Sequence, residues 1–331
     1  MIKSQELREW LGNPESQRRT HAAMDSFAAR WGKGLIHRRF ASAMEALPAQ
    51  SAEAVAGAVS ELFSDDAWLD TLTEELAEQL RRDRYFEPPF RSLHSEIHSG
   101  LLVYEDERVA IAAGVTGVGQ LAAKKNVARH AVSISFTGHV SVLKVVKSGG
   151  AYMSFWEAPP ITDGFVAAQA GHCVGKGGRH LVDGEVLIVD GRFQSYVIEH
   201  ASSDMILLQA SVKLDQAPLS VEYDAGTRRF VGASATDDAA SRIQNMTTLL
   251  RKMDCADAFP VVAAFLEDSN FFVRWHVMKE LLGIDAAAAL PHLRRLAQAD
   301  PHPDVRAAAS AVLDSVLLTH PVLAERLECR G

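Results

Sequence analysis

The spacing of apolar residues changes twice along the chain and divides it into three regions. In residues 1–88 apolar side chains recur every three or four positions, as at Leu72, Leu76 and Leu80, while alanine and glutamate are frequent and β-branched residues scarce. This period marks one face of an amphipathic helix, and the composition also favours helix. We therefore expect a helical N-terminal region that ends at a Pro-Pro pair.

Residues 91–235 combine valine, isoleucine and glycine in short runs separated by turn residues. The clearest case is the run 186–189, followed by Asp190-Gly191 and a second apolar run. Asp-Gly between two such runs is typical of a two-residue hairpin turn, because both residues tolerate positive φ. Nine or ten runs with tight connections predict an antiparallel β-barrel or sandwich.

Residues 237–331 return to the helical period and contain an internal repeat. Four residues recur 32 positions later in the same order: Asp268, Val273, Arg274 and Leu281 become Asp300, Val305, Arg306 and Leu313. Each copy indicates a helix, a turn near the aspartate, and a second helix that begins with Val-Arg. We expect the aspartate to cap the second helix or to accept a hydrogen bond from the next repeat's arginine, and the valine to enter a shared core.

This pattern resembles the HEAT-repeat family, in which Asp-Pro occupies the turn and Val-Arg begins the second helix. Asp300-Pro301 and Val305-Arg306 match it fully, and the first copy has Ser269 in place of the proline. The resemblance covers residues 256–316 and implies a stack of helix pairs, with an earlier helix at 241–253 as its cap.

The start of the second helix in the first copy is unusually aromatic. The residues concerned are Phe271, Phe272, Arg274 and Trp275. Aromatic side chains and arginine dominate protein interfaces, so these four are candidates for docking a partner. The alternative is packing within the chain, which we favour because a short repeat stack has an apolar flank that must be covered.

The middle region resembles the cupin or jelly-roll family, in the rhythm of GEVLIVDGRFQSYVIEHASSDMILLQASV. The metal site of that family uses a His-x-His motif followed by glutamate, and a second motif with one histidine after a Pro-Gly turn. Here His139 stands without a second histidine, and Gln194 and Ser195 lie where the later histidine would fall. The resemblance thus implies an α+β chain of N-terminal helices, a cupin-like barrel and HEAT-like helices, with a metal site that is degenerate or absent.

Histidines are nevertheless the candidate metal ligands. The five that we single out are His94, His98, His139, His172 and His180. A metal site needs three or four converging ligands, and no spacing here is diagnostic; isolated histidines are more often structural or exposed. His94 and His98, spaced i, i+4, share a face if they lie on a helix, or else belong to a polar turn. Iron, manganese, nickel or zinc is the cofactor that such a site implies.

Candidate ligand-binding residues come from the predicted strands. Alternation within YMSFW places Tyr152, Ser154 and Trp156 on one face. If the barrel interior is not filled, these residues line a small-molecule pocket together with Gln194 and Tyr196 of the hairpin that follows.

Two glycine-rich stretches also carry candidate chemistry. Residues 114–125 nearly spell a dinucleotide-binding fingerprint, but no Asp or Glu follows between residues 120 and 156 to bind a ribose. We expect a short helix across one end of the barrel there. Residues 171–180, GHCVGKGGRH, are expected to form a loop, either a lid or anion-binding loop or, as we favour, a plain surface loop.

Composition narrows the class of protein. The 331 residues are 47% hydrophobic and 23% charged, as in globular proteins, and their net charge of -8 disfavours nucleic acid as a partner. Three widely spaced cysteines make no disulfide framework. The chain has no apolar run of the ~18 residues that a membrane span needs, and its N-terminus lacks the apolar core of a secretory signal, so we expect no membrane partner and a cytoplasmic location.

Three functions stay open at this point. The first is a ligand- or partner-binding regulatory or scaffold protein, with a small ligand in the barrel and a protein partner or second copy on the HEAT-like tail. The second is an atypical metal-dependent cupin-type enzyme, an oxygenase or isomerase, that uses the barrel histidines. The third is a structural assembly protein. We favour the first, because the charge, the incomplete metal motifs and the repeat tail agree with it.

Overall fold

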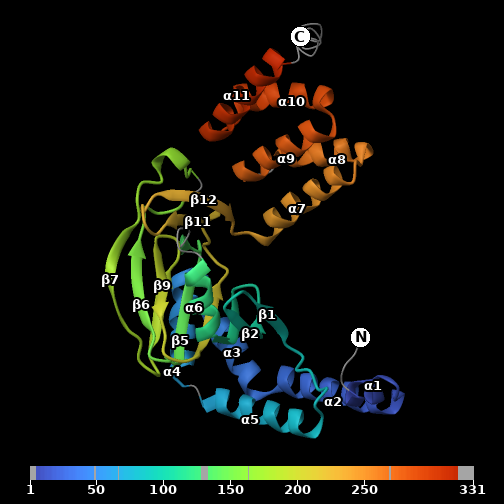
Figure 1. Cartoon of the computed structure of the whole chain (residues 1–331), viewed down its shortest axis with the longest axis vertical. Coiled ribbons are helices and arrows are strands. Elements are labelled where there is room, and N and C mark those ends of the chain that lie inside the picture. The colour runs from blue at the N-terminus through green and yellow to red at the C-terminus, as the bar shows by residue number, and fades with distance from the viewer. Residues whose placement is uncertain are drawn as a thin grey trace.

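The computed structural model describes residues 5–47, 50–65, 67–127, 133–162, 164–267 and 270–319. Helices come first along the chain, antiparallel sheets follow, and a second group of helices ends it, as the sequence predicts (Figure 1). None of the described helices is both long enough and apolar enough to span a bilayer.

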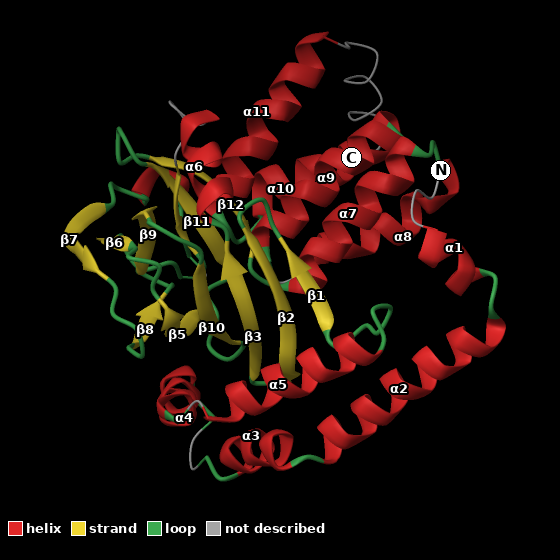
Figure 2. Cartoon of the chain, turned by 60° about the horizontal axis from the view of Figure 1, so that its bottom comes forward, coloured by secondary structure: helices red, strands yellow, loops and turns green. Residues whose placement is uncertain are grey.

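The N-terminal helices cover one face of a β-sheet (Figure 2). They are α1 (Gln5–Leu11), α2 (Pro14–Lys33), α3 (Leu35–Glu45), α4 (Ala52–Ser64) and α5 (Ala67–Arg82). α4 packs most closely, because Val55, Val59 and Phe63 on it are fully buried. The spacing of these three residues is the helical period, so α4 turns one apolar stripe toward the sheet.

The large sheet has six antiparallel strands in the order β1-β2-β3-β10-β5-β8. Their bounds are β1 (Arg91–His94), β2 (His98–Glu105), β3 (Val109–Thr116), β10 (Met205–Val212), β5 (Val140–Lys147) and β8 (Val186–Asp190). Leu208, Ala210 and Val212 of β10 belong to the apolar core shared with the N-terminal helices. Because side chains alternate along a strand, Gln209 and Ser211 point to the opposite face.

Two three-stranded sheets form the second layer, in the orders β12-β11-β4 and β7-β6-β9. Their bounds are β4 (Ser133–Phe136), β6 (Tyr152–Glu157), β7 (Val174–His180), β9 (Gln194–His200), β11 (Leu219–Asp224) and β12 (Phe230–Ala235). The Ser195 hydroxyl on β9 donates to the Ser135 carbonyl on β4 at 2.5 Å, so the two sheets lie edge to edge. The described residues thus form twelve strands rather than the nine or ten predicted.

The short helix expected near residue 120 is present as α6 (Val118–Val127), between β3 and β4. Its first residue donates its backbone N–H to the Asp204 carboxylate at 2.8 Å, which ties α6 to the β9–β10 loop. A carboxylate at a helix N-terminus satisfies a free N–H group and interacts favourably with the helix dipole.

The prediction of a loop at residues 171–180 is wrong for most of that range, because residues Val174–His180 form strand β7. Aromatic rings of the neighbouring strand β6 explain the glycines. A side chain at Gly178 would lie 2.7 Å from the Tyr152 ring, and one at Gly175 would lie 3.4 Å from the Trp156 ring. Glycine here makes room for rings that lie across the strand.

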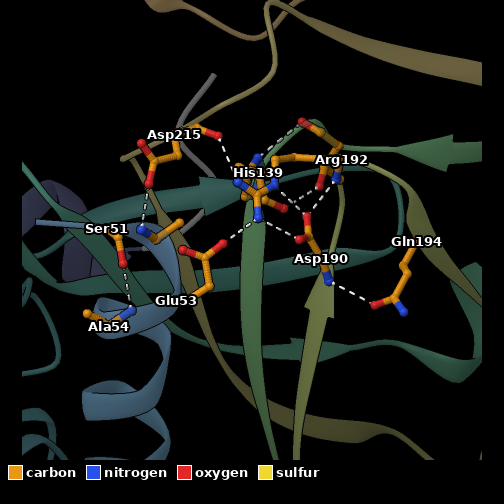
Figure 3. A network of polar contacts seen from close by, with 10 residues as sticks. Ser51, Glu53, Ala54, His139, Asp190, Arg192, Gln194 and Asp215 are labelled. Atoms are coloured by element: carbon orange, nitrogen blue, oxygen red, sulfur yellow. Dashed lines mark hydrogen bonds and ion pairs between the residues drawn. The ribbon is translucent and has the colours of Figure 1, made fainter. Parts of the chain in front are cut away.

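A polar cluster joins the N-terminal helices to the strands (Figure 3). The Arg192 guanidinium donates to Asp190 on its own hairpin at 2.6 Å and to Glu53 of α4 at 2.6 Å. The Asp215 carboxylate accepts the backbone N–H of Ala52, the first residue of α4, at 2.8 Å. Helix and strands are therefore held by groups that lie far apart in sequence.

The C-terminal helices are stacked in pairs (Figure 1). They are α7 (Asp238–Lys252), α8 (Phe259–Ala264), α9 (Phe271–Ile284), α10 (Ala286–Ala299) and α11 (Pro303–Thr319). Val273 and Val305, the repeated valines, are both buried in one core, as predicted.

A buried ion pair connects the two repeats. The Arg274 guanidinium makes two hydrogen bonds of 2.8 Å to the Asp300 carboxylate, whose side chain is fully buried. Asp300 also accepts the backbone N–H of His302 at 2.8 Å. Asp300 therefore binds an arginine, but that arginine belongs to the preceding repeat rather than the next, and the N–H group that Asp300 accepts is that of His302, which precedes α11. Asp268, its counterpart, lies outside the described residues.

Burial alone would raise the pKa of Asp300. The hydrogen bonds from Arg274 and from the His302 backbone, with the charge of Arg274, outweigh it and hold that pKa below its usual value. The pair therefore stays ionised at neutral pH.

Removing the carboxylate deprives the buried, charged Arg274 of both of its hydrogen bonds to Asp300. We expect Asp300→Ala to lower the free energy of unfolding of the C-terminal helices by about 3 kcal/mol, measured by urea denaturation followed by circular dichroism. Asp314→Ala removes an exposed carboxylate of α11 and should change it by less than about 0.5 kcal/mol. Equal effects of the two variants would contradict a stabilising role for the pair.

The same pair should make stability depend on pH. A carboxylate whose pKa is lower in the folded state stabilises fully above its unfolded pKa of about 4, and this contribution is lost as the pH falls toward the folded value. The stability difference between the native protein and Asp300→Asn, from denaturation at pH 7 and at pH 3, should thus be smaller at pH 3. A difference that stays constant would contradict this coupling.

Arg192 should matter more than either of its partners at the helix–strand junction. Arg192→Met removes two ion pairs at once, and we expect a loss of about 1.5–3 kcal/mol in the free energy of unfolding. Glu53→Gln breaks only the more exposed pair and should cost at most about 1 kcal/mol. Thermal and urea denaturation of both variants measure the two losses in the free energy of unfolding. A larger loss for Glu53→Gln than for Arg192→Met would contradict the prediction.

Candidate functional site

The five candidate metal ligands lie at separate places. His94 and His98 are on the two strands of the first hairpin, not on a helix, and His94 is exposed. His172 forms an isolated bridge with Arg229 just before β7, and His180 ends that strand.

His98 is the one of these histidines on the inward face of the large sheet. Its Nδ1 lies 2.7 Å from the Thr116 hydroxyl on β3. Its ring lies beside Gly114, where an added Cβ would be 3.7 Å from the His98 Cδ2 atom. Burial lowers the pKa of His98, so its ring is neutral at pH 7.

His139 lies in the turn between β4 and β5, beside the junction of Figure 3. Its Nδ1 is 3.1 Å from the Thr137 carbonyl. Its Nε2 is buried, and no group in the described part of the chain makes a hydrogen bond to it. Burial lowers the pKa of His139, although the Thr137 carbonyl opposes this effect.

These positions do not fit the metal site that a cupin resemblance implies. His98 and His139 are held by different partners on different elements. Among the described residues no three His, Cys, Asp or Glu side chains are grouped so that they could hold a metal ion. No step of a metal-dependent reaction follows from this arrangement.

The candidate ligand-binding residues lie on both faces of the second layer. Met153 and Ile198 belong to the apolar core between the layers, so Tyr152 and Ser154 point outward. Ser154 donates to Glu199 at 2.6 Å and accepts the indole N–H of Trp156 at 3.1 Å. Tyr152, Ser154 and Trp156 therefore form part of an outer surface.

The other two candidates lie on β9. Gln194 accepts the backbone N–H of Asp190 at 3.2 Å and so closes the β8–β9 hairpin. Tyr196 points between the layers, where it packs against the apolar core that contains Val145 and Leu207. Burial raises the pKa of Tyr196 to about 12, so its phenol stays protonated and can donate a hydrogen bond.

The space between the layers has an apolar end and a polar end. Buried Met153, Val145 and Leu207 fill the first. At the second, β4 and β11 bury Ile134, Phe136, Val221 and Tyr223 on the outer side of the layer. Their alternate residues therefore point inward, as Gln209 and Ser211 do from the large sheet.

We call the inward residues of this second end the inner face. Eight of them have small or polar side chains and are half-buried or exposed: Ala110, Ala112, Ser133, Ser135, Gln209, Ser211, Ser220 and Glu222. Leu143 and Ser141 of β5, which pair with Gln209 and Ser211, point the same way and are buried. Close-packed interiors bury positions like those eight almost completely. Water therefore reaches the space between the two layers at this end.

Hydrogen-bonding groups on the inner face are available to a ligand. In the part of the chain that the structure describes, the inner-face side chains of Gln209 and Glu222 have no hydrogen-bond or ion-pair partner, and neither has Tyr196 beside the apolar end. Sequence reasoning found Tyr196 but missed Gln209 and Glu222. The signal was present in LLQASV, where polar residues alternate with apolar ones on a strand.

The aromatic residues of α9 lie against the strands. Phe271 and Phe272 pack on the outer core of the second layer, and the His302 ring stacks on Phe271 at 3.8 Å. His302 Nε2 lies 3.1 Å from the Phe165 carbonyl, and Asp304 accepts the backbone N–H of Ala167 at 3.2 Å.

The other two interface candidates face the helices. Trp275 packs on the core of the C-terminal helices, and Arg274 binds Asp300. A pocket of about 300 Å³ remains where α9 meets β12, lined in part by Phe165, Phe230 and Gln244.

Residues 233–314 match a family model described as HEAT repeats. The C-terminal helices are therefore similar to HEAT repeats, as their sequence pattern predicted. No curated protein matches the chain.

Solved structures similar to this chain match its strand region. A cupin domain from Bordetella pertussis Tohama I is 10% identical, with 37% of this chain and 98% of that chain covered and a TM-score of 0.22. An RmlC-like cupin from Shewanella frigidimarina is 11% identical, with 38% and 85% covered and a TM-score of 0.23. An uncharacterised double-stranded β-helix protein from Klebsiella pneumoniae is 11% identical, with 40% and 88% covered and a TM-score of 0.23. At these values the likeness concerns the fold of the strand region and extends to no activity.

Proposed function

We propose that this chain is a regulatory or scaffold protein that binds a small polar molecule on the inner face and a protein partner, or a second copy, through its HEAT-like helices. The observation that carries the first part is the reversed polarity of the two layers. At the end away from Met153 and Leu207, both bury apolar side chains on their outer sides and present mostly small or polar ones to each other.

The inner face favours a ligand with several hydrogen-bonding groups. Glu222 and the serines accept hydrogen bonds, while the phenol of Tyr196 and the amide of Gln209 can donate them. A few polar groups beside an apolar wall are typical of small-molecule sites. Sugars, polyols and amino-acid derivatives have this chemistry.

The HEAT-like helices support the second part. The side chains of Met246 and Leu249 on α7, and of Met253 directly after it, recur at helical spacing and stay exposed. An apolar stripe on a terminal helix of a repeat stack is a surface that a protein can cover.

Filling the inner face should abolish ligand binding. We would screen sugars, polyols, amino acids and nucleosides for those that raise the melting temperature, and then compare affinities by calorimetry. Ala112→Phe places a ring beside Gln209, its partner across β3 and β10, and should remove binding. Glu222→Gln should weaken a ligand that bonds to this carboxylate by about 1.5–3 kcal/mol.

Ala287→Phe adds the same ring to an exposed position of α10 and is the control. It should leave affinity unchanged. A ligand that binds Ala112→Phe as tightly as the native protein would show that its site is elsewhere and would contradict the proposal.

A further inference from the structure

Three aromatic side chains form a row across the outer side of the second layer. Tyr152 on β6 pairs directly with His180 on β7 and with His200 on β9. Directly paired residues of neighbouring strands point to the same face. A register shift between Tyr152 and Met153 leaves Glu199 as an extra residue and brings His200 level with the tyrosine.

The rings of this row are in contact. The Tyr152 and His200 rings are stacked, with centroids 5.6 Å apart and planes 3° from parallel. The His180 ring meets Tyr152 edge-on at 5.2 Å, and the two imidazole centroids are 6.0 Å apart with planes at 79°. Tyr152 thus forms a platform on which both imidazoles rest.

A glycine on the neighbouring strand makes room for this row of rings. The Tyr152 ring lies over Gly178, where any side chain would collide with it. His180 and His200 are both exposed. No hydrogen bond to either imidazole is present within the described residues, so their ring nitrogens are open to a ligand.

We propose that His180 and His200 together bind one divalent transition-metal ion of the class Cu²⁺, Ni²⁺ or Zn²⁺. Neutral imidazole is a preferred ligand of these ions. With metal–nitrogen distances of about 2.0–2.1 Å, two imidazoles on one tetrahedral ion have centroids roughly 5 Å apart. The observed centroid separation is 6.0 Å, so the two exposed rings must rotate slightly toward a common ion.

The two histidines leave the remaining coordination positions to water or to a metal-binding ligand from solution. This site lies on the outer side of the second layer, opposite the inner face. It is therefore independent of the proposed small-molecule site, and each can fail without the other.

The test uses the full chain with any affinity tag removed. Titration calorimetry with Cu²⁺, Ni²⁺ and Zn²⁺ should show one ion per chain. His180→Ala and His200→Ala should each weaken binding by at least the ~10-fold that loss of an outer-shell partner already costs a metal site. His172→Ala removes an exposed histidine next to the same strand and is the matched control, with unchanged affinity expected.

Two further measurements separate a metal site from a purely structural row. Binding should weaken as the pH is lowered, because protons compete with the metal ion for the imidazole nitrogens. Tyr152→Phe keeps the platform ring and should retain binding, and electron paramagnetic resonance of the Cu²⁺ complex should show two nitrogen ligands.

Folding of each variant is checked by its melting temperature. If well-folded His180→Ala and His200→Ala variants bind the ion as tightly as the native protein, or if the native protein binds none in metal excess, the proposal is overturned. The row is then only a packing device of the sheet.

Discussion

The alternation of side chains along the strands governs most of this structure. On the large sheet one set of alternate residues packs on the N-terminal helices, and on the second layer one set packs under the segment that contains Ile161 and Cys173. Where these outer sides are covered, the apolar side chains of each sheet are buried away from the other sheet. Only one end of the space between them is filled with apolar side chains, so the other end is free to be polar.

The N-terminal and C-terminal elements that cover the outer sides therefore supply burial that the accessible inner face does not. Each is fastened by polar groups at its margin. Arg192 and Asp215 fasten α4 to the strand loops, and His302 and Asp304 fasten the C-terminal helices to the segment near Phe165.

Much of the fold followed from sequence because its signals are local. The helical periods, the Asp-Gly hairpin and the repeated Val-Arg pairs each depend on a few neighbouring residues. The loop predicted over β7 was wrong because the cause of its glycines, the rings of Tyr152 and Trp156, comes from another strand. The alternative that paired the repeat aspartate with the next repeat's arginine was wrong for Asp300 for the same kind of reason, since the motif does not show which arginine reaches it.

The candidate site was harder to predict. Alternation correctly divides Tyr152 from Met153, but only the coverings decide which of the two faces is inward. For Gln209 the sequence showed only that polar and apolar residues alternate along its strand. Whether Gln209 faces inward depended on the helices that pack against the alternate residues Leu208 and Ala210. The two histidines of the outer row are twenty residues apart, and only the common partner Tyr152 brings them together.

The cap on α4 bears on how the chain is made. Asp215, which accepts the first N–H group of that helix, is 163 residues further along the chain. During synthesis α4 emerges long before its cap, as do the strands that bury its apolar stripe. A contact of such length forms late, because closing a long loop is entropically costly. The N-terminal helices are therefore synthesised before the strands that bury their apolar face, and during this interval the exposed face is prone to aggregation.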